Sequence, residues 1–454
     1  MRNAISSSAR AGAVAGIVAA ACFATACAGT AKLTEHQVSG PAPTLTPPDK
    51  APVPTINVVK AIGWPAGVKP DTGEGLAVTA FARDLEHPRW IAVLPNGDVL
   101  VAETNAPERP MDKSGLRGWL FGRAQRKAGG AVPSANRITL LRDADGDGVA
   151  EVRSAFLTGL NSPFGMTLVG DTLYVANTDA LLKVPYTAGA LRAGATPQKV
   201  IDLPAGVRNH HWTKNVIASP DGRTLYVAIG SNSNAAEHGL AEEDGRAQLW
   251  AVDVATGAHR AYATGMRNPV GMAWVPETGK LWVAVNERDE LGPDLVPDYM
   301  TAVQDGAFYG WPFSYFGSHV DTRVSPQDPA KVASAVVPDY ALGAHTASLG
   351  LAYTSAASGR SGLTPHFATG MFVGQHGSWN REPRAGYKVV FVPFVDGAPA
   401  GPSIDVLDGF VTAEGLAYGR PVGVALDKRG GLLVADDVGN VIWRVRAADG
   451  AQTN

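Results

Sequence analysis

Hydrophobic residues alternate along this chain in short segments separated by turn residues, and one such phrase recurs six times. Each copy has an apolar lead-in, a turn, and then a glycine followed by alternating hydrophobic positions. A hydrophobic period of two between turn residues is typical of strands and hairpins. The copies begin at Gly97, Gly170, Gly222, Gly279, Gly370 and Gly430.

The repeat predicts one closed ring of sheets rather than several domains. A repeated unit that cannot bury its apolar face alone must stack on its neighbours. Blades of about four antiparallel strands around an axis meet that need and leave few exposed edges. We therefore predict an all-β, six-bladed β-propeller over residues 76–447. The uneven spacing of the copies indicates inserted loops, and we expect insertions 107–133 and 315–337 to shape a pocket.

The N-terminal region has a different composition. Residues 1–27 are predicted to be a signal peptide, with two arginines followed by an apolar stretch of small residues. The sequence ATAC at residues 24–27 resembles a bacterial lipobox, so Cys27 is either lipidated or follows an ordinary cleavage site. Residues 28–75 are a Pro/Thr-rich tether and lead-in, of which 39–54 have the composition of a semi-rigid, unfolded spacer. We expect an exported protein, periplasmic or lipid-anchored to a bacterial membrane.

Charge and cysteine content narrow the class further. The formal net charge is −3, which gives no electrostatic reason to expect nucleic acid. The one basic stretch, residues 113–127, is either an amphipathic helix on a membrane or partner or, more commonly, a loop helix with a solvated face. Both cysteines lie in residues 1–27, so the mature domain has no disulfide. After residue 27 no run of 18 apolar residues occurs, so we expect membrane attachment only through Cys27.

Several common catalytic motifs are absent. The sequence has no GxGxxG after a strand, no CxxCH, no HExxH and no GxSxG. The remaining candidates are polar residues at blade edges. Adjacent histidines on a strand point to opposite faces, so at most one of His210 and His211 faces a given site. A lone histidine is more often structural, but Arg208, Asn209 and Trp212 at this blade start favour a functional one.

Three further segments carry candidate chemistry. Arg267 and Asn268 open the fourth repeat, where an arginine fork suits carboxylates and planar carbonyls. Residues 286–298 carry Glu287 and Asp289, which suit calcium, although a solvated acidic loop is the plain alternative. A polar, aromatic segment at 374–381 and Arg420 complete the set.

A separate acidic loop resembles the first half of an EF-hand. It has aspartates at positions 1, 3 and 5 and glycine at position 6, but Ser154 stands at position 12. The loop is either a structural calcium site or an unmetallated Asx-rich turn. Its candidate ligands are Asp143, Asp145, Asp147 and Glu151.

These segments resemble one known family. The phrases TKNV before SPDG, RNPVGMA, GAFYGWP and RPVGVALD together resemble the glucose/sorbosone dehydrogenases, soluble quinoprotein sugar dehydrogenases with a six-bladed propeller. The resemblance runs from about Leu76 to Val445 and is closest to the L-sorbosone dehydrogenase-like branch. It implies pyrroloquinoline quinone (PQQ) beside a calcium ion. A histidine would take the substrate hydroxyl proton while hydride passes to the quinone.

The resemblance also implies roles for individual residues. His211 matches the base, and His210 stands where some members carry Asp. Arg267 and Asn268 match a pair that contacts the quinone, and Arg420 matches an arginine that pairs with a cofactor carboxylate. Further cofactor-binding candidates are Arg89, Trp90 and His376.

The sequence departs from the family at three places. Arg288 and Asp289 occupy the position of two calcium-binding carbonyls, which leaves Glu287, Asp289 and the main-chain oxygens of this loop as candidate calcium ligands. His376 replaces a lysine and Val422 an arginine, so the cofactor has fewer cationic contacts.

We expect PQQ-dependent, calcium-assisted oxidation of a sugar or sugar aldehyde, with electrons leaving to an external acceptor. Two alternatives remain open: a non-catalytic cell-surface propeller that binds carbohydrate or protein, and a calcium-dependent lactonase-like hydrolase. Candidate hydrolase residues are Glu103, Asn177, Asn215 and Asp436, although such residues more often end strands and cap turns. Activity without quinone would distinguish the hydrolase.

Overall fold

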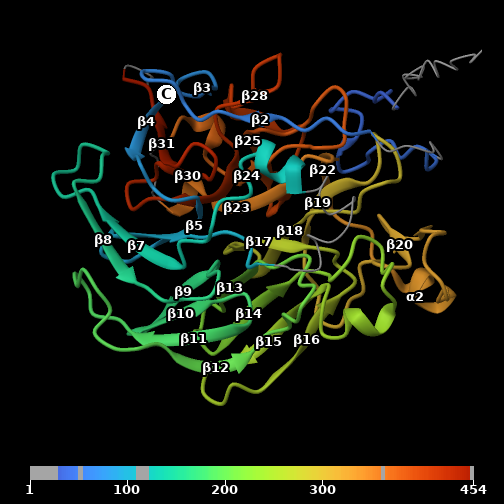
Figure 1. Ribbon diagram of the computed structural model, residues 1–454, viewed down its shortest axis with the longest axis horizontal. Helices are drawn as coiled ribbons and strands as arrows, with labels where there is room; N and C mark the ends of the chain where they lie inside the picture. The colour runs from blue at the N-terminus through green and yellow to red at the C-terminus, as the bar shows by residue number, and fades with distance from the viewer. Residues whose placement is uncertain (1–28, 50–54, 109–121, 359–362, 450–454) are drawn as a thin grey trace, which may run out of the picture.

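The computed structural model describes residues 29–49, 55–108, 122–358 and 363–449. Within them the chain forms six antiparallel blades around one axis, which confirms the predicted six-bladed propeller (Figure 1). Each repeated phrase is the hairpin into the second strand of a blade, as the alternating pattern predicts. Among the described residues no helix is both long and apolar enough to cross a membrane.

The first three blades follow one another along the chain. Blade 1 is β5 (Pro88–Val93), β6 (Val99–Glu103), β7 (Arg137–Arg142) and β8 (Val152–Leu157). Blade 2 is β9 (Met166–Val169), β10 (Thr172–Ala176), β11 (Ala180–Pro185) and β12 (Gln198–Asp202). Blade 3 is β13 (Lys214–Ala218), β14 (Thr224–Ile229), β15 (Gln248–Asp253) and β16 (His259–Thr264).

Blades 4 and 5 carry most of the additional short elements. Blade 4 is β17 (Pro269–Val275), β18 (Lys280–Val285), β19 (Pro297–Ala302) and β22 (Tyr340–Ala344). Blade 5 is β23 (Ser348–Thr354), β24 (Gly370–Gln375), β25 (Lys388–Val395) and β27 (Ile404–Asp408), with β26 (Ala398–Pro399) beside β25. The insertion before β22 contains β20 (Ser314–Tyr315), β21 (His319–Val320) and α2 (Pro329–Ser334). Single 3-10 turns are η2 (Leu240–Glu243), η3 (Ala356–Ser358) and η4 (Pro365–Phe367), and residues 122–127 are helical.

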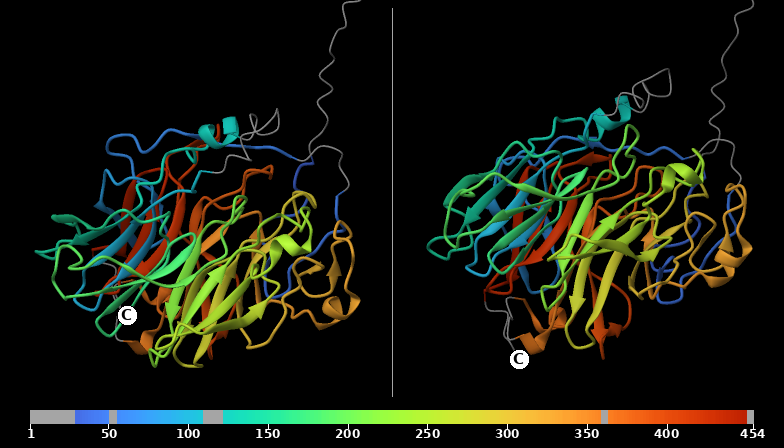
Figure 2. Two further views of the ribbon diagram at one scale, coloured as in Figure 1. Left: turned by 60° about the horizontal axis from the view of Figure 1, so that its bottom comes forward. Right: turned by 90° about the horizontal axis from the view of Figure 1, so that it is seen from below.

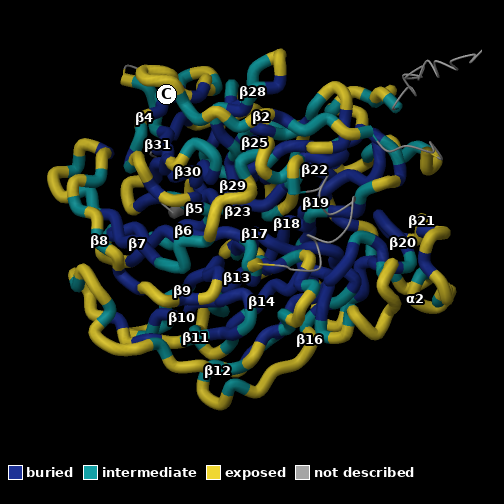
Figure 3. Tube along the Cα trace, in the orientation of Figure 1, coloured by how far each residue is buried: buried dark blue, intermediate teal, exposed yellow. Residues whose placement is uncertain are grey.

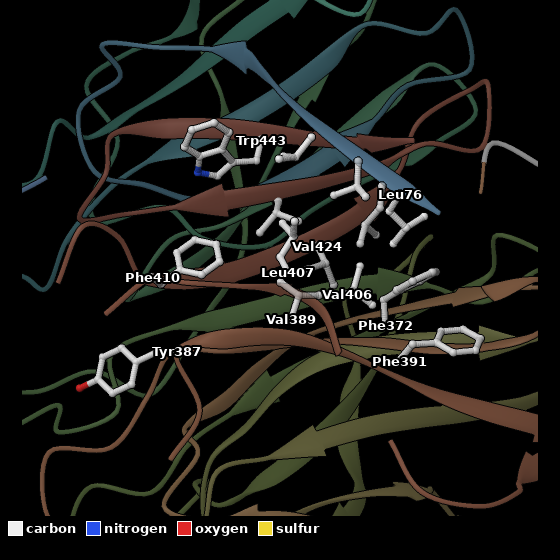
Figure 4. Packing of buried hydrophobic residues seen from close by; sticks show 14 of the residues in the cluster. Leu76, Phe372, Tyr387, Val389, Phe391, Val406, Leu407, Phe410, Val424 and Trp443 are labelled. Atoms are coloured by element: carbon white, nitrogen blue, oxygen red, sulfur yellow. The ribbon is translucent and has the colours of Figure 1, made fainter. Parts of the chain in front are cut away.

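Blade 6 joins the two ends of the chain. Its strands β29 (Pro421–Leu426), β30 (Leu432–Asp436) and β31 (Val441–Ala447) come from the C-terminal region, and its outer strand β4 (Leu76–Ala82) comes from the N-terminal region. The β31–β4 pairing therefore closes the ring. The packing between this blade and blade 5 is dense and aromatic, with Phe372, Phe391 and Trp443 fully buried (Figures 3 and 4).

Two glycines permit adjacent inner strands to approach closely. A Cβ on Gly423 would lie 2.7 Å from the main-chain oxygen of Arg89 and 3.2 Å from Cα of Trp90. A Cβ on Gly165 would overlap Asn215 of the next blade. The lead-ins SPFGM and RPVGV therefore have glycine at this position for a steric reason. A side chain there would collide with the inner strand of the neighbouring blade.

The N-terminal lead-in is more ordered than its composition predicts. Strand β1 (Ser39–Gly40) pairs with β22, β2 (Lys60–Ala61) with β28 (Leu416–Ala417), and β3 (Asp71–Thr72) with β27. Over residues 39–49 the predicted unfolded spacer is therefore not observed, because neighbouring blades supply the partners that a proline-rich segment lacks by itself. Residues 1–27 and 50–54 lie outside the described residues.

Candidate functional site

Most of the predicted site residues gather at one end of the propeller, apart from Trp90 and the acidic loop at residues 143–151. Inner strands begin there and second strands end there, as the pairings Lys214↔Ile229 and Pro269↔Val285 show. The segments just before the first strand and just after the second strand of several blades therefore meet around the axis.

His211 is held as a neutral imidazole with one free ring nitrogen. Its Nδ1 lies 2.9 Å from the main-chain oxygen of Ser231 and 3.0 Å from Oγ of the same residue. Because a carbonyl oxygen can only accept, we infer that Nδ1 carries the hydrogen and Nε2 the lone pair. Burial, reinforced by the charge of Arg267, lowers the pKa of His211 well below its ordinary value. This arrangement suits a general base.

His210 has a different environment. Its side chain is exposed, its ring stands nearly perpendicular to that of His211 at a centroid distance of 4.6 Å, and its main-chain N–H donates to Asn232 at 3.3 Å. The two histidines thus present their rings differently, with only His211 partly enclosed.

Asn268 lies beside the base because Gly230 leaves room for both. A Cβ on Gly230 would overlap the side-chain oxygen of Asn268 and Cβ of His211. The Oδ1 atom of Asn268 is buried and has no hydrogen-bond partner among the described residues. A buried polar atom without a partner is costly unless a ligand or water completes it.

Arg267 is buried and supports the loop that follows β18. It donates to the main-chain oxygen of Glu287 at 2.7 Å and to Oδ1 of Asn234 at 2.9 Å, and lies 3.4 Å from Asp289. Trp311 also donates to the main-chain oxygen of Asn234 at 3.0 Å. Arg267 therefore orders this edge of the site through protein contacts.

The two candidate calcium ligands in this loop have cationic partners. Glu287 pairs with Arg288 at 3.0 Å, and Asp289 with His345 at 3.4 Å as well as with Arg267. Although burial opposes ionisation, His345 and Arg267 hold the pKa of Asp289 below its usual value. One carboxylate oxygen of Glu287, Oε1, is buried and has no partner in the described part of the chain.

A second polar cluster surrounds Asp437, directly after β30. Arg89 and His376 each contact its carboxylate at 2.9 Å. Burial, and then the charge of Arg420, lowers the pKa of His376 to about 4. Arg420 donates to the main-chain oxygens of His376 and Gly377, both at 2.8 Å. Within the described part of the chain Arg420 has no carboxylate partner.

Arg89 connects the two clusters, whereas Trp90 does not take part. The guanidinium of Arg89 lies 5.7 Å above the ring of Trp212, next to His211, and its Nε is buried without a partner. Trp90 packs in the core against Phe164 at a centroid distance of 4.8 Å.

The EF-hand-like loop lies apart from this site, between β7 and β8. One ligand atom from each of Asp143, Asp145, Asp147 and Glu151 can be chosen so that all lie within 4.8 Å of one another. Over the described ranges this is the only group of three or more His, Cys, Asp or Glu residues with such spacing. Main-chain N–H groups of Gly146 and Gly148 donate to Asp143.

The four hydrolase candidates make mainly structural contacts. Glu103 accepts from Arg137 at 2.7 Å, and Asp436 accepts from the indoles of Trp64 at 2.6 Å and Trp443 at 3.1 Å. Asn215 donates to the main-chain oxygen of Val270 at 2.7 Å. The side-chain oxygen of Asn177 is buried without a partner.

Sequence reasoning missed several residues that complete the site. These residues share a position that could have been recognised in the sequence. They follow the second strand of a blade, as in AIGSNSN and VADD, or precede the first strand of the next blade, as in GAHTA. They are Ser231, Asn234, His345 and Asp437.

The fold and this polar ring define a six-bladed propeller with a candidate site at the axis. Residues 134–302 and 315–448 match the TrAA12-like family, and the chain belongs to that family. The likeness to soluble sugar dehydrogenases expected from the sequence is thereby confirmed for family and fold.

Solved structures with the same fold include fungal and bacterial proteins. A Trichoderma reesei structure of carbohydrate-active enzymes family AA12 has a TM-score of 0.66 and 18% identity, covering 84% of this chain and 98% of that one. The holo PQQ domain of pyranose dehydrogenase from Coprinopsis cinerea has a TM-score of 0.65 and 20% identity, and the match covers 86% of this chain and 100% of that one. The PQQ-bound aldose sugar dehydrogenase of Streptomyces coelicolor has a TM-score of 0.52 and 16% identity, and the match covers 83% of this chain and 99% of that one. An uncharacterized Borreliella burgdorferi protein is 24% identical over 296 residues, 63% of this chain and 76% of that protein.

Proposed function

We propose that this protein oxidises a sugar or sugar aldehyde with PQQ as the hydride acceptor. The observation that carries the proposal is His211, a partly enclosed neutral imidazole whose Nδ1 is held by Ser231. The PQQ-containing sugar dehydrogenases with this fold support the choice of cofactor and substrate class.

The residues around the axis fit a planar, anionic cofactor. Asn268 Oδ1 and Arg89 Nε are buried polar atoms without partners, and Arg420 lacks a carboxylate partner among the described residues. Asn268, Arg89 and Arg420 would hold the cofactor, beside His376 and the more exposed His210. When bound, PQQ supplies the carbon that accepts hydride.

The chain's own residues account for proton transfer. Nε2 of His211 accepts the proton of the substrate hydroxyl, because its pKa is lowered by burial and the imidazole is neutral at neutral pH. Ser231 holds Nδ1–H and so fixes the ring orientation and the tautomer. Arg420 provides positive charge near the Asp437 cluster.

Calcium assistance belongs to the same proposal. Oε1 of Glu287 is the carboxylate oxygen in the 286–289 loop that is buried without a partner, so it is the ligand most available to a cation. Asp289 already pairs with Arg267 and His345, so a cation would have to compete with these two side chains for its carboxylate. The Asp143–Glu151 loop is proposed as a structural calcium site.

The deciding experiment is reconstitution of the purified protein with PQQ, with and without calcium. Cofactor absorbance and dye reduction would be followed across aldoses, sorbosone and other aldehydes. We expect saturable PQQ uptake and substrate-dependent reduction, weakened by a chelator. No uptake by the folded protein would favour the binding propeller, and turnover without quinone would favour the hydrolase.

The adjacent histidines provide a matched pair of variants. His211→Ala should lower kcat by about 10²- to 10⁴-fold, the usual contribution of a general base, while PQQ uptake is retained. His210→Ala, on an exposed side chain at the edge of the proposed cofactor position, should lower kcat less than His211→Ala does. Full activity of His211→Ala would overturn the mechanism even if PQQ binds.

A further inference from the structure

Two segments that hold none of the residues assigned to the proposed reaction lie together on one side of the molecule, and one of them belongs to the insertion 107–133 that the sequence predicts to shape the pocket. Residues 55–69 run across blade 6, and residues 122–127 form a short helix beside them (Figure 2). Nζ of Lys127 donates to the main-chain oxygen of Val58 at 2.7 Å, and a Cβ on Gly129 would lie 2.9 Å from Cβ of Ala61. The two segments therefore form one continuous surface.

This surface combines positive charge with exposed aliphatic side chains. Arg123, Arg126 and Lys127 occupy positions i, i+3 and i+4 of the helix, so they share one face, and all three are exposed. Lys60 is exposed on the neighbouring segment. Ile56 is 66% exposed, Ile62 45% and Val132 46%.

The charge of the surface contrasts with that of the whole protein. Neither residues 55–69 nor residues 122–136 contain an acidic side chain, although the chain has a formal net charge of −3. Charged neighbours include Arg384, which donates to Asn57 at 2.6 Å, and Glu382, which accepts from Asn57. Asp436 accepts from Trp64 at 2.6 Å, and Glu414 precedes Gly415, whose main-chain oxygen accepts from Lys60 at 2.8 Å. The cations still outnumber the carboxylates after these are included.

The surface also lies beside the point where the chain enters the described structure. Oγ1 of Thr55 donates to the main-chain oxygen of Gly29 at 2.8 Å. Gly29 is only two residues from Cys27. A lipid on Cys27, as the lipobox resemblance predicts, would be attached two residues before this contact.

We propose that this surface, formed by Ile56, Lys60, Ile62, Arg123, Arg126 and Val132, docks on an anionic lipid bilayer. Basic residues with exposed aliphatic side chains are typical of interfacial membrane binding. Nucleic acid would more commonly be met by cations with aromatic side chains. The proposal goes beyond the reaction and does not depend on it.

The test is binding to vesicles by the exported protein. Vesicles of phosphatidylcholine alone are compared with vesicles containing about one-third phosphatidylglycerol, by co-sedimentation at low and high salt. Binding through an N-terminal anchor or leader would be the same for both kinds of vesicle. Binding through the basic surface would be tighter to the vesicles that contain anionic lipid. We expect at least tenfold tighter binding to the anionic vesicles, largely lost at high salt.

A matched pair of charge reversals assigns the binding to this surface. Lys60→Glu/Arg126→Glu should weaken anionic-vesicle binding by at least tenfold, because each cation near such a surface contributes roughly fivefold. Lys183→Glu/Lys280→Glu makes the same change in net charge at exposed positions on β11 and β18, and should bind as the unmodified protein does. Thermal unfolding checks that both variants fold.

Three outcomes would overturn the proposal. The first is equal binding to both kinds of vesicle, and the second is equal loss in both variants. The third is retention on heparin without vesicle binding, which would indicate a polyanionic macromolecule instead. Sugar oxidation is not measured in this test, so its result is independent of the proposed reaction.

Discussion

At the scale of single residues, the proposed chemistry rests on the protonation of His211. Its Nδ1 faces a carbonyl oxygen, and burial with the nearby charge of Arg267 lowers its pKa below the ordinary 6.5. Ionisation of this imidazole is therefore shifted to a more acidic range than that of a histidine in water.

The pH dependence of turnover follows from this shift. The rate requires neutral His211, so the acid limb of kcat/KM should lie below pH 6.5. The position of this acid limb is measured from the profile of kcat/KM between pH 4 and 8. An acid limb centred at pH 6.5 or above would contradict the assigned environment.

Gly230 is expected to be indispensable to the spacing of the base and Asn268. In Gly230→Ala the new Cβ would overlap both neighbours, so kcat should fall by at least about tenfold while the blades stay folded. Gly194→Ala is the control, because a Cβ there meets no atom within 4 Å. Turnover and circular dichroism of both variants provide the comparison, and an active Gly230→Ala would show that the spacing is not critical.

At the scale of elements, the repeated hairpins were predictable, whereas only part of the site was. Each phrase such as GRTLYVAIG carries its own alternation and turn, so the blades follow from local sequence. Ser231, His345 and Asp437 gained their roles only when strands far apart in the chain met around the axis. The ordered lead-in at residues 39–49 was missed for the same reason, since its partner β22 lies three hundred residues away.

The Asp437 cluster joins the end of β30 to blades 1 and 5. In Asp437→Asn the buried Arg89 loses its carboxylate, and we expect a loss of about 3–5 kcal/mol of unfolding free energy. Asp305→Asn, which breaks an exposed pair with Arg260, should cost less than about 1 kcal/mol. Denaturant unfolding of both variants measures the difference, and equal losses would contradict the structural role.

At the scale of the whole molecule, stability should depend on the pairing of the two chain ends. Deleting residues 76–82 removes β4 and leaves β31 as an open edge. We expect cooperative loss of the whole propeller rather than of blade 6 alone, seen as one transition shifted to lower temperature. A variant that loses only blade 6, with the other blades unchanged by hydrogen exchange, would contradict this expectation.

The same closure sets an order of events during synthesis. Strand β4 emerges among the first ordered parts of the chain, yet its partner β31 is nearly the last. During almost all of translation, strand β4 therefore lacks the partner strand that it pairs with in the folded protein. The ring can therefore be completed only after the final strand has been synthesised.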